Sequence, residues 1–475
     1  MPGIPRPHRW LVLALLLAGA VVLLVPASAM PDPANRVAAV AVLMAVLWVT
    51  EAIPIPVTAL LPLALFPLLE VMPLDQVTAN YAHHLVFLFL GGFWLAAAVQ
   101  HSGLHRRIAL HVLRLVGSHV DHIVLGFMAA TAFLSMWLSN TATTMMMLPI
   151  ALAVVARLGD ESPKGFSRVL MLGLAYAASI GGVATLVGSP PNAVLAGVAQ
   201  QTLGIEIGFG RWLLIGLPLT LLMLPIGWWY LTRVNSRLAH TPVHAGHQLI
   251  SEELRQLGKA GSAEKRVLAV FAGVAFLWIF KGLFPLELIS GLRDSSIAIA
   301  GALLLFVVPD GTARGRPLLD WPTAAKIPWD ILILFGGGFA LAQGFQQSGL
   351  TGWIGQQMDF LSGTHAFVLL AVVAVVTLFL TEITSNTATA SMLLPVVAGI
   401  ASAAAQDPLA PMIAAALAAS FAFMLPVATP PNAIVFASRQ VSMAEMARAG
   451  LWMNLVGIIL ICCLVWFLVP LSTNL

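Results

Sequence analysis

The chain has 475 residues, of which 59% are apolar and 9% are charged, with a formal net charge of +3. Soluble domains carry about 25% charged residues, and a water-soluble globule could not bury this much apolar surface. The composition therefore predicts an all-α integral membrane protein and excludes a soluble enzyme, a nucleic-acid-binding protein and a disordered scaffold. At about 20 apolar residues per spanning helix, the length allows roughly ten to twelve helices with short loops.

The N-terminal segment, residues 1–35, allows two interpretations. Arg6 and Arg9 precede an apolar run over residues 10–25, which Ala27-Ser28-Ala29 follows. This pattern is typical of a cleaved signal peptide, but also of a first transmembrane helix with a positive cytoplasmic flank. We favour a retained helix, because the next apolar segment begins only a few residues later.

Two apolar stretches, 122–157 and 364–402, are too long for one simple crossing, and each has Ser-Asn-Thr near its centre. Inside a membrane, non-helical backbone survives only where protein or water lines it. A polar triplet in the middle of a stretch of this length therefore predicts a re-entrant hairpin. We expect two such hairpins.

Two other apolar segments, 168–204 and 409–438, contain Pro-Pro-Asn at 190–192 and 430–432. Because proline removes a helix hydrogen bond and restricts the residue before it, each pair should break its helix into two halves. With these segments counted as one crossing each, the chain is predicted to have about eleven transmembrane helices.

The basic residues predict the orientation. Successive loops are assigned to alternate sides of the membrane. With this assignment, 17 of the 23 Lys and Arg residues lie on one side, and Arg439 and Arg448 are among the six on the other. The excess indicates a cytoplasmic N-terminus in the inner (plasma) membrane of a multi-pass protein and an external C-terminus. The stretch Leu104–Gly117 has apolar positions at helical spacing with basic residues between them, which predicts an amphipathic helix at the cytoplasmic interface.

The chain contains an internal repeat. Ser-Gly-Leu at 102–104 and Ser-Asn-Thr-Ala-Thr at 139–143 reappear 246 residues later, and Pro-Pro-Asn-Ala at 190–193 reappears 240 residues later. An odd number of crossings separates corresponding segments, so the repeats should have inverted topology, which is typical of secondary transporters. The predicted units are an N-terminal helix, a first repeat, a cytoplasmic connecting loop and a second repeat: 1–35, 36–235, 236–266 and 267–475.

The repeated motifs supply oxygen ligands and free helix ends near the middle of the membrane. Hydroxyl, amide and freed carbonyl oxygens suit Na⁺, and helix N-termini suit an anion. No Lys or Arg occurs between Arg114 and Arg157 or between Lys326 and Arg439. Since a desolvated anion is costly without a counter-charge, bound sodium would have to provide it, which predicts obligatory coupling.

Single features of the sequence also allow other interpretations. Ser, Thr and Gly are common packing residues in membrane helices, but two copies of Ser-Asn-Thr, each paired with a Pro-Pro-Asn break, favour a site. Glu382 could relay protons or bind a cation, or it could hydrogen-bond a neighbouring helix end, which we favour. The sequence shows no transition-metal cluster, P-loop or nucleophile elbow, so we do not expect an enzyme.

At these motifs the sequence resembles the divalent anion–sodium symporter family, whose members carry dicarboxylates, citrate or, in some cases, sulfate. The resemblance covers nearly the whole chain. It implies inverted repeats, two re-entrant hairpins and broken helices, in a homodimer with a scaffold and a moving transport domain. The residues that carry it are Thr50-Glu51-Ala52-Ile53-Pro54, Phe89-Leu90-Gly91-Gly92-Phe93, Gly103-Leu104-His105-Arg106-Arg107, both Ser-Asn-Thr triplets, and the segments 188–192 and 428–432.

The resemblance also implies the ligands. The first sodium site would use Ser135, Ser139, Asn140 and Gly188. The second would use Thr381, Thr384, Asn386 and Ala428. The substrate would contact Ser139, Asn140, Thr141, Ser189, Ser385, Asn386, Thr387 and Thr429.

The leading hypothesis is a sodium-coupled importer of a divalent anion, such as the C4-dicarboxylate succinate, that works by an elevator-type motion in the lipid bilayer. One alternative is a sodium-independent anion exchanger or a sulfate or citrate carrier on the same fold. A second is a channel or membrane receptor that uses the same broken helices.

Overall fold

The structure, a computed structural model, describes residues 6–24, 29–115, 117, 119–159, 163–236, 238, 244–283, 291–312, 315–361 and 363–472. Apart from isolated β-bridge residues at 119, 309 and 317, the regular elements in these ranges are helices. This confirms the all-α class. Residues 27 and 28 of the possible signal-peptide cleavage site lie outside the described ranges.

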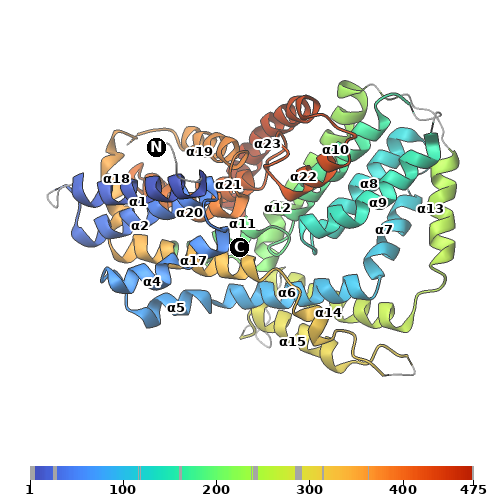
Figure 1. The fold of residues 1–475 in the computed structure, drawn as a ribbon, viewed down its shortest axis with the longest axis horizontal. Coiled ribbons are helices and arrows are strands. Elements are labelled where there is room, and N and C mark those ends of the chain that lie inside the picture. Colours follow the sequence, from blue (N-terminus) through green and yellow to red (C-terminus); the bar gives the residue numbers. More distant parts are fainter. Residues whose placement is uncertain are drawn as a thin grey trace.

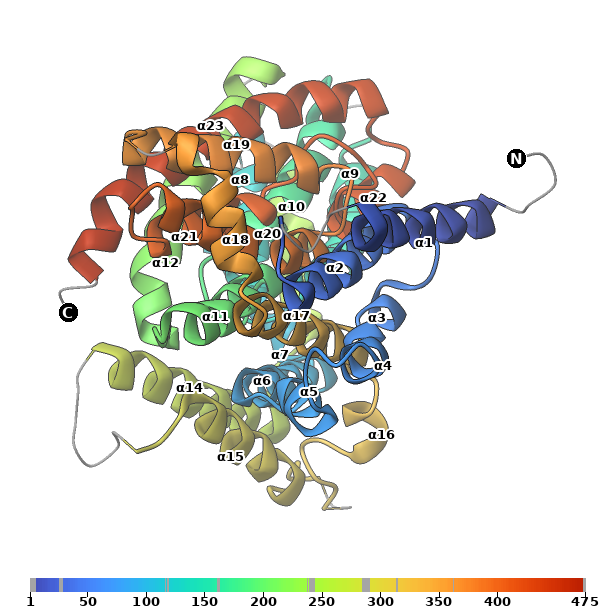
Figure 2. The same cartoon turned by 90° about the vertical axis from the view of Figure 1, so that its left-hand side faces the viewer.

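The chain begins with a pair of long helices. Helix α1 (Arg6–Leu24) packs along α2 (Asp32–Thr50), and three short helices follow: α3 (Ile55–Thr58), α4 (Leu61–Leu68) and α5 (Leu74–Tyr81). The second residue of each of α2, α3 and α4 is a proline, which fits these helix starts, because proline is tolerated in the first turn, where the backbone N–H has no intrahelical partner. Figure 2 shows α1 projecting from the side of the bundle.

The first half of the remaining chain contains the expected hairpin and broken helix. Residues 136–139 separate α8 from α9, which begins at Asn140 within the Ser-Asn-Thr triplet, and Pro190 begins α11 after an unwound segment at 183–189. The amphipathic stretch forms α7, which packs against α8. The helices are α6 (His84–His101), α7 (Leu104–Leu115), α8 (Val120–Ser135), α9 (Asn140–Leu158), α10 (Phe166–Gly182), α11 (Pro190–Leu203) and α12 (Phe209–Trp229), which a π-helical turn extends over Tyr230–Asn235.

The second half repeats this order of helices after four connecting ones. Its unwound segment spans 420–429. The connecting helices are α13 (His244–Gln256), α14 (Ser262–Leu283), α15 (Asp294–Val307) and α16 (Trp321–Ala324). The repeated helices are α17 (Trp329–Gln347), α18 (Leu350–Gln357), α19 (Ala366–Thr381), α20 (Asn386–Ala403), α21 (Leu409–Ala419), α22 (Pro430–Ala437) and α23 (Met443–Ser472), with a 3₁₀ turn at Asp359–Leu361.

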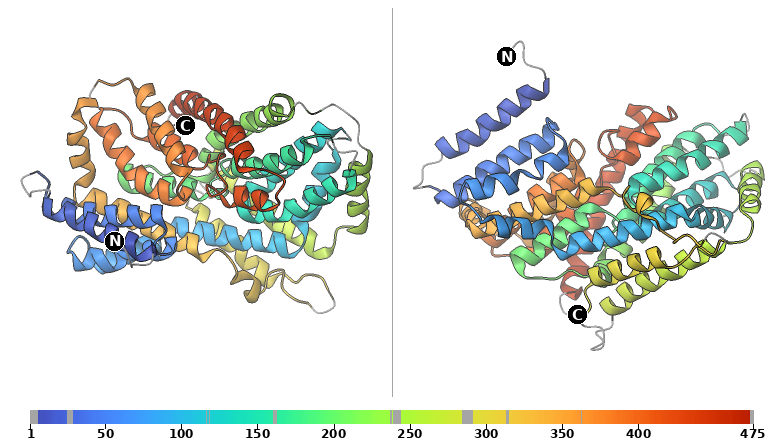
Figure 3. Two further views of the ribbon diagram at one scale, coloured as in Figure 1. Left: turned by 45° about the horizontal axis from the view of Figure 1, so that its top comes forward. Right: turned by 60° about the horizontal axis from the view of Figure 1, so that its bottom comes forward.

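The two hairpins lie at opposite ends of the molecule. Figure 1 shows α8, α9 and α10 at one end and α19, α20 and α21 at the other, with α11 and α22 between them. Helices α14 and α15 form an outer layer next to α6, which Figure 2 shows at the bottom. The right-hand view of Figure 3 shows α1 in dark blue, far from the C-terminal end.

Six stretches of described helix are long and apolar enough to cross a membrane by length and composition: α2, the pair α5–α6, α9, α12 with its π-helical turn, α20 and α23. Of these, α9 and α20 are arms of the predicted hairpins. The count of about eleven crossings, the cytoplasmic N-terminus and the boundaries of the two repeats remain predictions.

One part of the predicted orientation is wrong. Arg168, at the start of α10, pairs with Glu445 at 2.5 Å, and Ser167 Oγ donates to Gln440 Oε1 at 2.8 Å. The loop before α23 therefore lies at the same face as the start of α10. Arg439 and Arg448 belong on that side and not on the opposite one, because α21 and α22 together carry the chain across as one broken helix.

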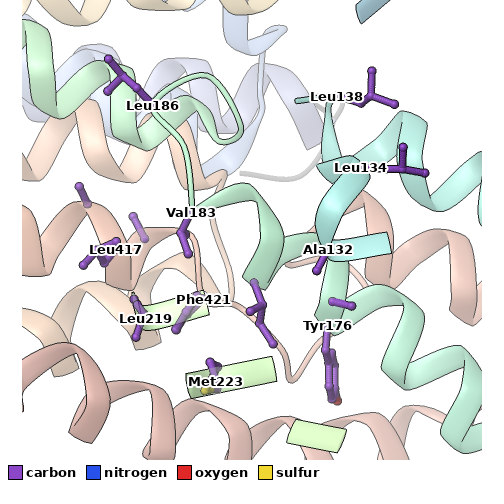
Figure 4. Packing of buried hydrophobic residues seen from close by; sticks show 14 of the residues in the cluster. Ala132, Leu134, Leu138, Tyr176, Val183, Leu186, Leu219, Met223, Leu417 and Phe421 are labelled. Atoms are coloured by element: carbon purple, nitrogen blue, oxygen red, sulfur yellow. The ribbon is translucent and has the colours of Figure 1, made fainter. Parts of the chain in front are cut away.

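The unwound segments are set into a single large apolar cluster. Val183 and Leu186 from the first segment belong to it, as do Leu219 from α12 and Phe421 from the second segment. Figure 4 shows these side chains from close by. The non-helical backbone is thus covered by protein, which is the condition for its presence at membrane depth.

Candidate functional site

The tip of the first hairpin is tied to the broken helix of its own half. Ser135, at the end of α8, is buried, and its hydroxyl lies 2.6 Å from Asn140 Oδ1 and 2.7 Å from Ala178 O in α10. Ser139 caps α9, because its hydroxyl accepts from Ala142 N at 3.3 Å. One serine hydroxyl therefore links both arms of the hairpin to α10.

Oxygen atoms gather around Gly182 and Gly188 beside this tip. A Cβ at Gly188 would lie 2.5 Å from Gly182 O, 3.0 Å from Met136 O and 3.1 Å from Ser135 O. A Cβ at Gly182 would lie 2.6 Å from Asn140 Oδ1 and 3.1 Å from Gly188 O. We call these five oxygens the first oxygen cluster. It is the donor set that a hard cation prefers.

The first oxygen cluster includes oxygens from Ser135, Asn140 and Gly188, three of the four residues predicted for the first sodium site. The side chain of the fourth, Ser139, is engaged as the cap of α9. The carbonyls of Met136 and Gly182 are additional members that the sequence did not indicate. Any residue type has a backbone carbonyl, so no sequence signal could have identified them.

The second hairpin repeats the same arrangement. Thr381 Oγ1 lies 2.7 Å from Asn386 Oδ1 and 2.9 Å from Ala419 O of α21. The hydroxyl of Thr384 is engaged within the hairpin, 2.5 Å from Thr389 Oγ1 and 2.8 Å from Leu380 O. The fourth predicted ligand, Ala428, is buried in the unwound segment 420–429.

The Pro-Pro-Asn motifs fasten both unwound segments in the same way. Asn192 Nδ2 donates to the carbonyls of Gly182 and Thr185, ten and seven residues earlier, at 3.3 and 2.8 Å. Asn432 Nδ2 donates to carbonyls ten and seven residues earlier, both at 3.0 Å. The amide oxygens of both asparagines are buried, and neither oxygen has a hydrogen-bond partner in the described part of the chain. These asparagines belong to the predicted motif, but the sequence did not indicate that they hold the unwound segments.

The two halves interlock crosswise. Helix α22 packs against α9 of the first hairpin, and α11 packs against α20 of the second, so each broken helix reaches the opposite hairpin (Figure 1). The buried hydroxyls of Ser189 and Ser420 join the halves at 2.9 Å. Within the described ranges, no hydrogen bond joins the two Ser-Asn-Thr tips directly.

The predicted substrate-contacting residues lie at the N-terminal ends of α9, α11, α20 and α22. Thr429 Oγ1 caps α22 by accepting from Asn432 N at 3.3 Å, whereas Ser189 and Ser385 make no side-chain cap. Thr141 and Ser385 are half-buried, and Thr387 is buried. Helix N-termini with N–H groups that no side chain caps favour an anion.

The charges around the motifs are few. No Lys or Arg occurs in residues 115–156, 169–210 or 327–438, which contain all four motifs. The acidic residue nearest to the second tip is Glu382. Its carboxylate accepts from the backbone N–H groups that follow α21, which confirms the favoured interpretation of a bond to a helix end. The site can thus hold cations on neutral oxygens and an anion on helix ends, without a fixed positive side chain.

Known proteins are similar to this chain over nearly its whole length. Residues 7–473 match the family described as the sodium:sulfate symporter transmembrane region. The chain is 42% identical over 472 residues to the sodium-dependent dicarboxylate transporter SdcS of Staphylococcus saprophyticus, with 97% of this chain and 91% of that protein covered. The protein of the same name from Staphylococcus aureus strain USA300 is 42% identical over 445 residues, with 91% and 86% covered.

Two solved structures share the fold. The YdaH transporter of Alcanivorax borkumensis has a TM-score of 0.58 at 17% identity and covers 82% of this chain and 86% of its own. MtrF of Neisseria gonorrhoeae, an antimetabolite efflux pump, has a TM-score of 0.53 at 14% identity, with 82% and 83% covered. At these identities the likeness concerns the helical fold alone.

Proposed function

The chain belongs to the sodium:sulfate symporter family, and from this premise we propose that it is a sodium-coupled transporter that imports a C4-dicarboxylate such as succinate. Membership in this family makes it a multi-pass membrane transporter and not an enzyme. The finer proposal concerns the cargo, the coupling ion and the motion.

The observation that carries the proposal is the repeated contact of a hydroxyl, an asparagine oxygen and a helix carbonyl at both hairpin tips. Ser135 and Asn140 make it in the first half, and Thr381 and Asn386 make it in the second. Each set offers a cation several oxygens. Two sodium ions would balance a dianion, which the absence of Lys and Arg from these segments otherwise leaves without a counter-charge.

The asparagines provide a physical reason for coupling. An amide has an acceptor on one side and two donors on the other. When sodium holds the oxygen of Asn140 or Asn386, the amide nitrogen faces away from the ion and can donate to a substrate carboxylate. Without sodium, the amide oxygen accepts the hydrogen bond from the hydroxyl of Ser135 or Thr381 that the structure shows. A hydroxyl group fixes the orientation of the amide less strongly than a bound cation would.

A dicarboxylate fits the crosswise geometry better than sulfate does. The two tips belong to different halves, so a substrate with a carboxylate at each end can contact both, whereas sulfate concentrates its charge on one centre. The names of the relatives agree with this choice, since both are called dicarboxylate transporters. The family description names sulfate, which remains the second candidate.

We further propose an elevator-type motion. The hairpins and broken helices, α8–α11 and α19–α22, pack on one another and would move as one body against α6, α14, α15 and α17. We expect a homodimer in the inner membrane with the N-terminus in the cytoplasm. These features follow from the family resemblance.

The direct test is uptake of labelled succinate into proteoliposomes that contain the purified protein. An inward sodium gradient should drive uptake, and the same gradient of potassium should not. Unlabelled malate, fumarate, citrate and sulfate then compete against succinate in sodium. Uptake that needs internal anion but no sodium would identify an exchanger, competition by sulfate alone would identify a sulfate carrier, and passive conductance would identify a channel.

A further inference from the structure

The two halves differ at one position beside the hairpin tips. Glu382 lies 246 residues after Met136, so a carboxylate in the second half replaces a methionine in the first. Glu382 is 4% exposed and forms no ion pair with a basic residue of the described chain. A buried carboxylate without a basic partner is costly, so its other contacts must compensate.

Four N–H donors surround this carboxylate. Oε1 accepts from Phe423 N at 2.8 Å, Met424 N at 3.0 Å and Asn454 Nδ2 at 2.6 Å. Oε2 accepts from Met424 N and Leu425 N, both at 3.2 Å. The carboxylate therefore acts only as an acceptor, as an ionised carboxylate does, and three consecutive backbone N–H groups point at it.

The lengths of the two unwound segments explain why these N–H groups need a partner. The first spans seven residues, 183–189, and the second spans ten, 420–429. In the first half, the N–H groups of Val183 and Ala184 still donate to Gly181 O at the end of α10. Their counterparts, 240 residues later, follow a helix that ends earlier. Buried backbone N–H groups must be paired, and Glu382 supplies the acceptor.

Glu382 binds backbone N–H groups of the second unwound segment, and Asn432 binds its backbone carbonyls. The carboxylate binds the N–H groups of 423–425, and the Asn432 amide binds the carbonyls of Ala422 and Leu425. Ala428, the predicted carbonyl ligand, follows in the same segment, where its N–H donates to Leu425 O. The orientation of the Ala428 carbonyl thus depends on a segment that Glu382 fixes.

We propose that Glu382 is a positioning residue of the second sodium site, which fixes the unwound segment 420–429 so that its oxygens face Asn386. The proposal rests on the proposed sodium-coupled function. The first sodium site has no such carboxylate, because the first oxygen cluster is fixed by Thr185, whose hydroxyl donates to Met136 O, and by Trp212, whose Nε1 donates to Val183 O.

The test compares Glu382→Gln with the wild-type protein and with Glu253→Gln, which neutralises a carboxylate that pairs with Arg106 on α7, outside the hairpins. Two readouts are sodium titrations: succinate uptake by proteoliposomes, and the sodium-dependent rise in Tm of the purified protein without substrate. We expect E382Q to raise the half-saturating sodium concentration by about tenfold or more, and to recover the wild-type Vmax and succinate KM once sodium saturates. E253Q should behave as wild type.

A folded E382Q protein with the wild-type sodium titration would overturn the proposal, as would a lower Vmax at unchanged sodium affinity. If E382Q does not fold, Asn454→Ala provides the second variant, because it removes one of the four donors. It should shift the sodium titration in the same direction by less, and an unchanged titration would overturn the proposal. A wild-type protein with no sodium response at all would instead overturn the proposed function.

Discussion

The two halves of the molecule build the same contact with different supports. In both, a hydroxyl of the first hairpin arm meets the asparagine of the second arm and a carbonyl of the broken helix. The first half supports it with a short unwound segment and two glycines whose missing side chains make room for five oxygens. The second half has a longer segment, held by a carboxylate.

The sequence repeat therefore preserves the proposed ligands and not the contacts that support them. The first oxygen cluster is fixed by close packing, so added volume should damage it most. The second site is fixed by charge-assisted hydrogen bonds, so loss of charge should damage it most. If the two sites hold sodium, they should therefore respond to different substitutions.

The largest expected effect comes from the asparagines. Asn140→Ala and Asn386→Ala each remove an oxygen ligand for sodium and an N–H donor for the substrate. Each contact with a charged partner is worth about 1.5–3 kcal/mol, so together their loss should lower uptake at fixed sodium by at least about 100-fold. Uptake by proteoliposomes and size-exclusion chromatography would separate lost function from lost folding.

The matched control is Asn235→Ala, at the end of the π-helical turn, where the amide nitrogen donates to Ser236 Oγ at 3.4 Å. It should transport as wild type. If folded N140A and N386A both transport normally, neither half contains the site that we describe.

Added volume tests the first half alone. Gly188→Ala would place a methyl group within 3.1 Å of three carbonyl oxygens of the first oxygen cluster. We expect the half-saturating sodium concentration to rise by about tenfold, or ~1.4 kcal/mol. The control is Gly273→Ala in α14, where a methyl group meets nothing within 4 Å. An unchanged sodium titration for G188A would mean that this cluster binds no cation.

Substitution of the asparagine in each Pro-Pro-Asn motif tests the contacts that fasten the unwound segment in both halves. Asn192→Ala and Asn432→Ala each remove two bonds to buried carbonyls. We expect each to destabilise the protein by about 1–3 kcal/mol, measured as a decrease in Tm in detergent. Because the contacts match, the two losses should be similar. A large loss for one variant and none for the other would contradict the equivalence of the two unwound segments.

The smallest effect concerns α7, which is tied to the connecting helices. Arg107 contacts both carboxylate oxygens of Glu264 at 2.8 and 3.0 Å. Desolvation raises the pKa of Glu264, but the hydrogen bonds from Arg107 and from Gly261 N outweigh it, so its pKa lies below the ordinary value of 4.5. The stabilisation is therefore present above pH 4.5 and is lost as the pH falls through the lowered pKa.

We expect Glu264→Gln to reduce the difference in Tm between pH 7 and pH 4, by an amount equivalent to less than about 1 kcal/mol. The counterpart helix α18 has no basic residue, so the ion pair is specific to the first half. An E264Q protein with the full wild-type dependence on pH would show that this pair does not stabilise the α7 contact.

Much of the fold follows from the sequence, because polar triplets and prolines inside apolar runs have few physical solutions in a membrane. The hairpins and the breaks before Pro190 and Pro430 were predictable in this way, and the helix over 104–115 was predictable from its apolar positions at helical spacing with basic residues between them. So were the hydroxyl and asparagine members of the site, which repeat at a fixed spacing.

The remainder depends on three-dimensional packing. The carbonyls of Met136 and Gly182 have no residue signature, and the crosswise packing of α11 and α22 depends on tertiary contacts alone. The side assigned to Arg439 and Arg448 was wrong because it did not follow the count of segment 409–438 as one crossing, and the contact of Arg168 with Glu445 corrects it. The bond between Glu382 and a helix end was predictable in kind, but not which three N–H groups it would hold.

In the proposed transporter, each half binds one sodium ion beside a single dianion. The most direct measurement is the ratio of sodium flux to succinate flux into the same proteoliposomes, with both labelled. If each half binds one sodium ion, at least two sodium ions should enter with each succinate. A ratio of one, or succinate uptake without sodium flux, would contradict it.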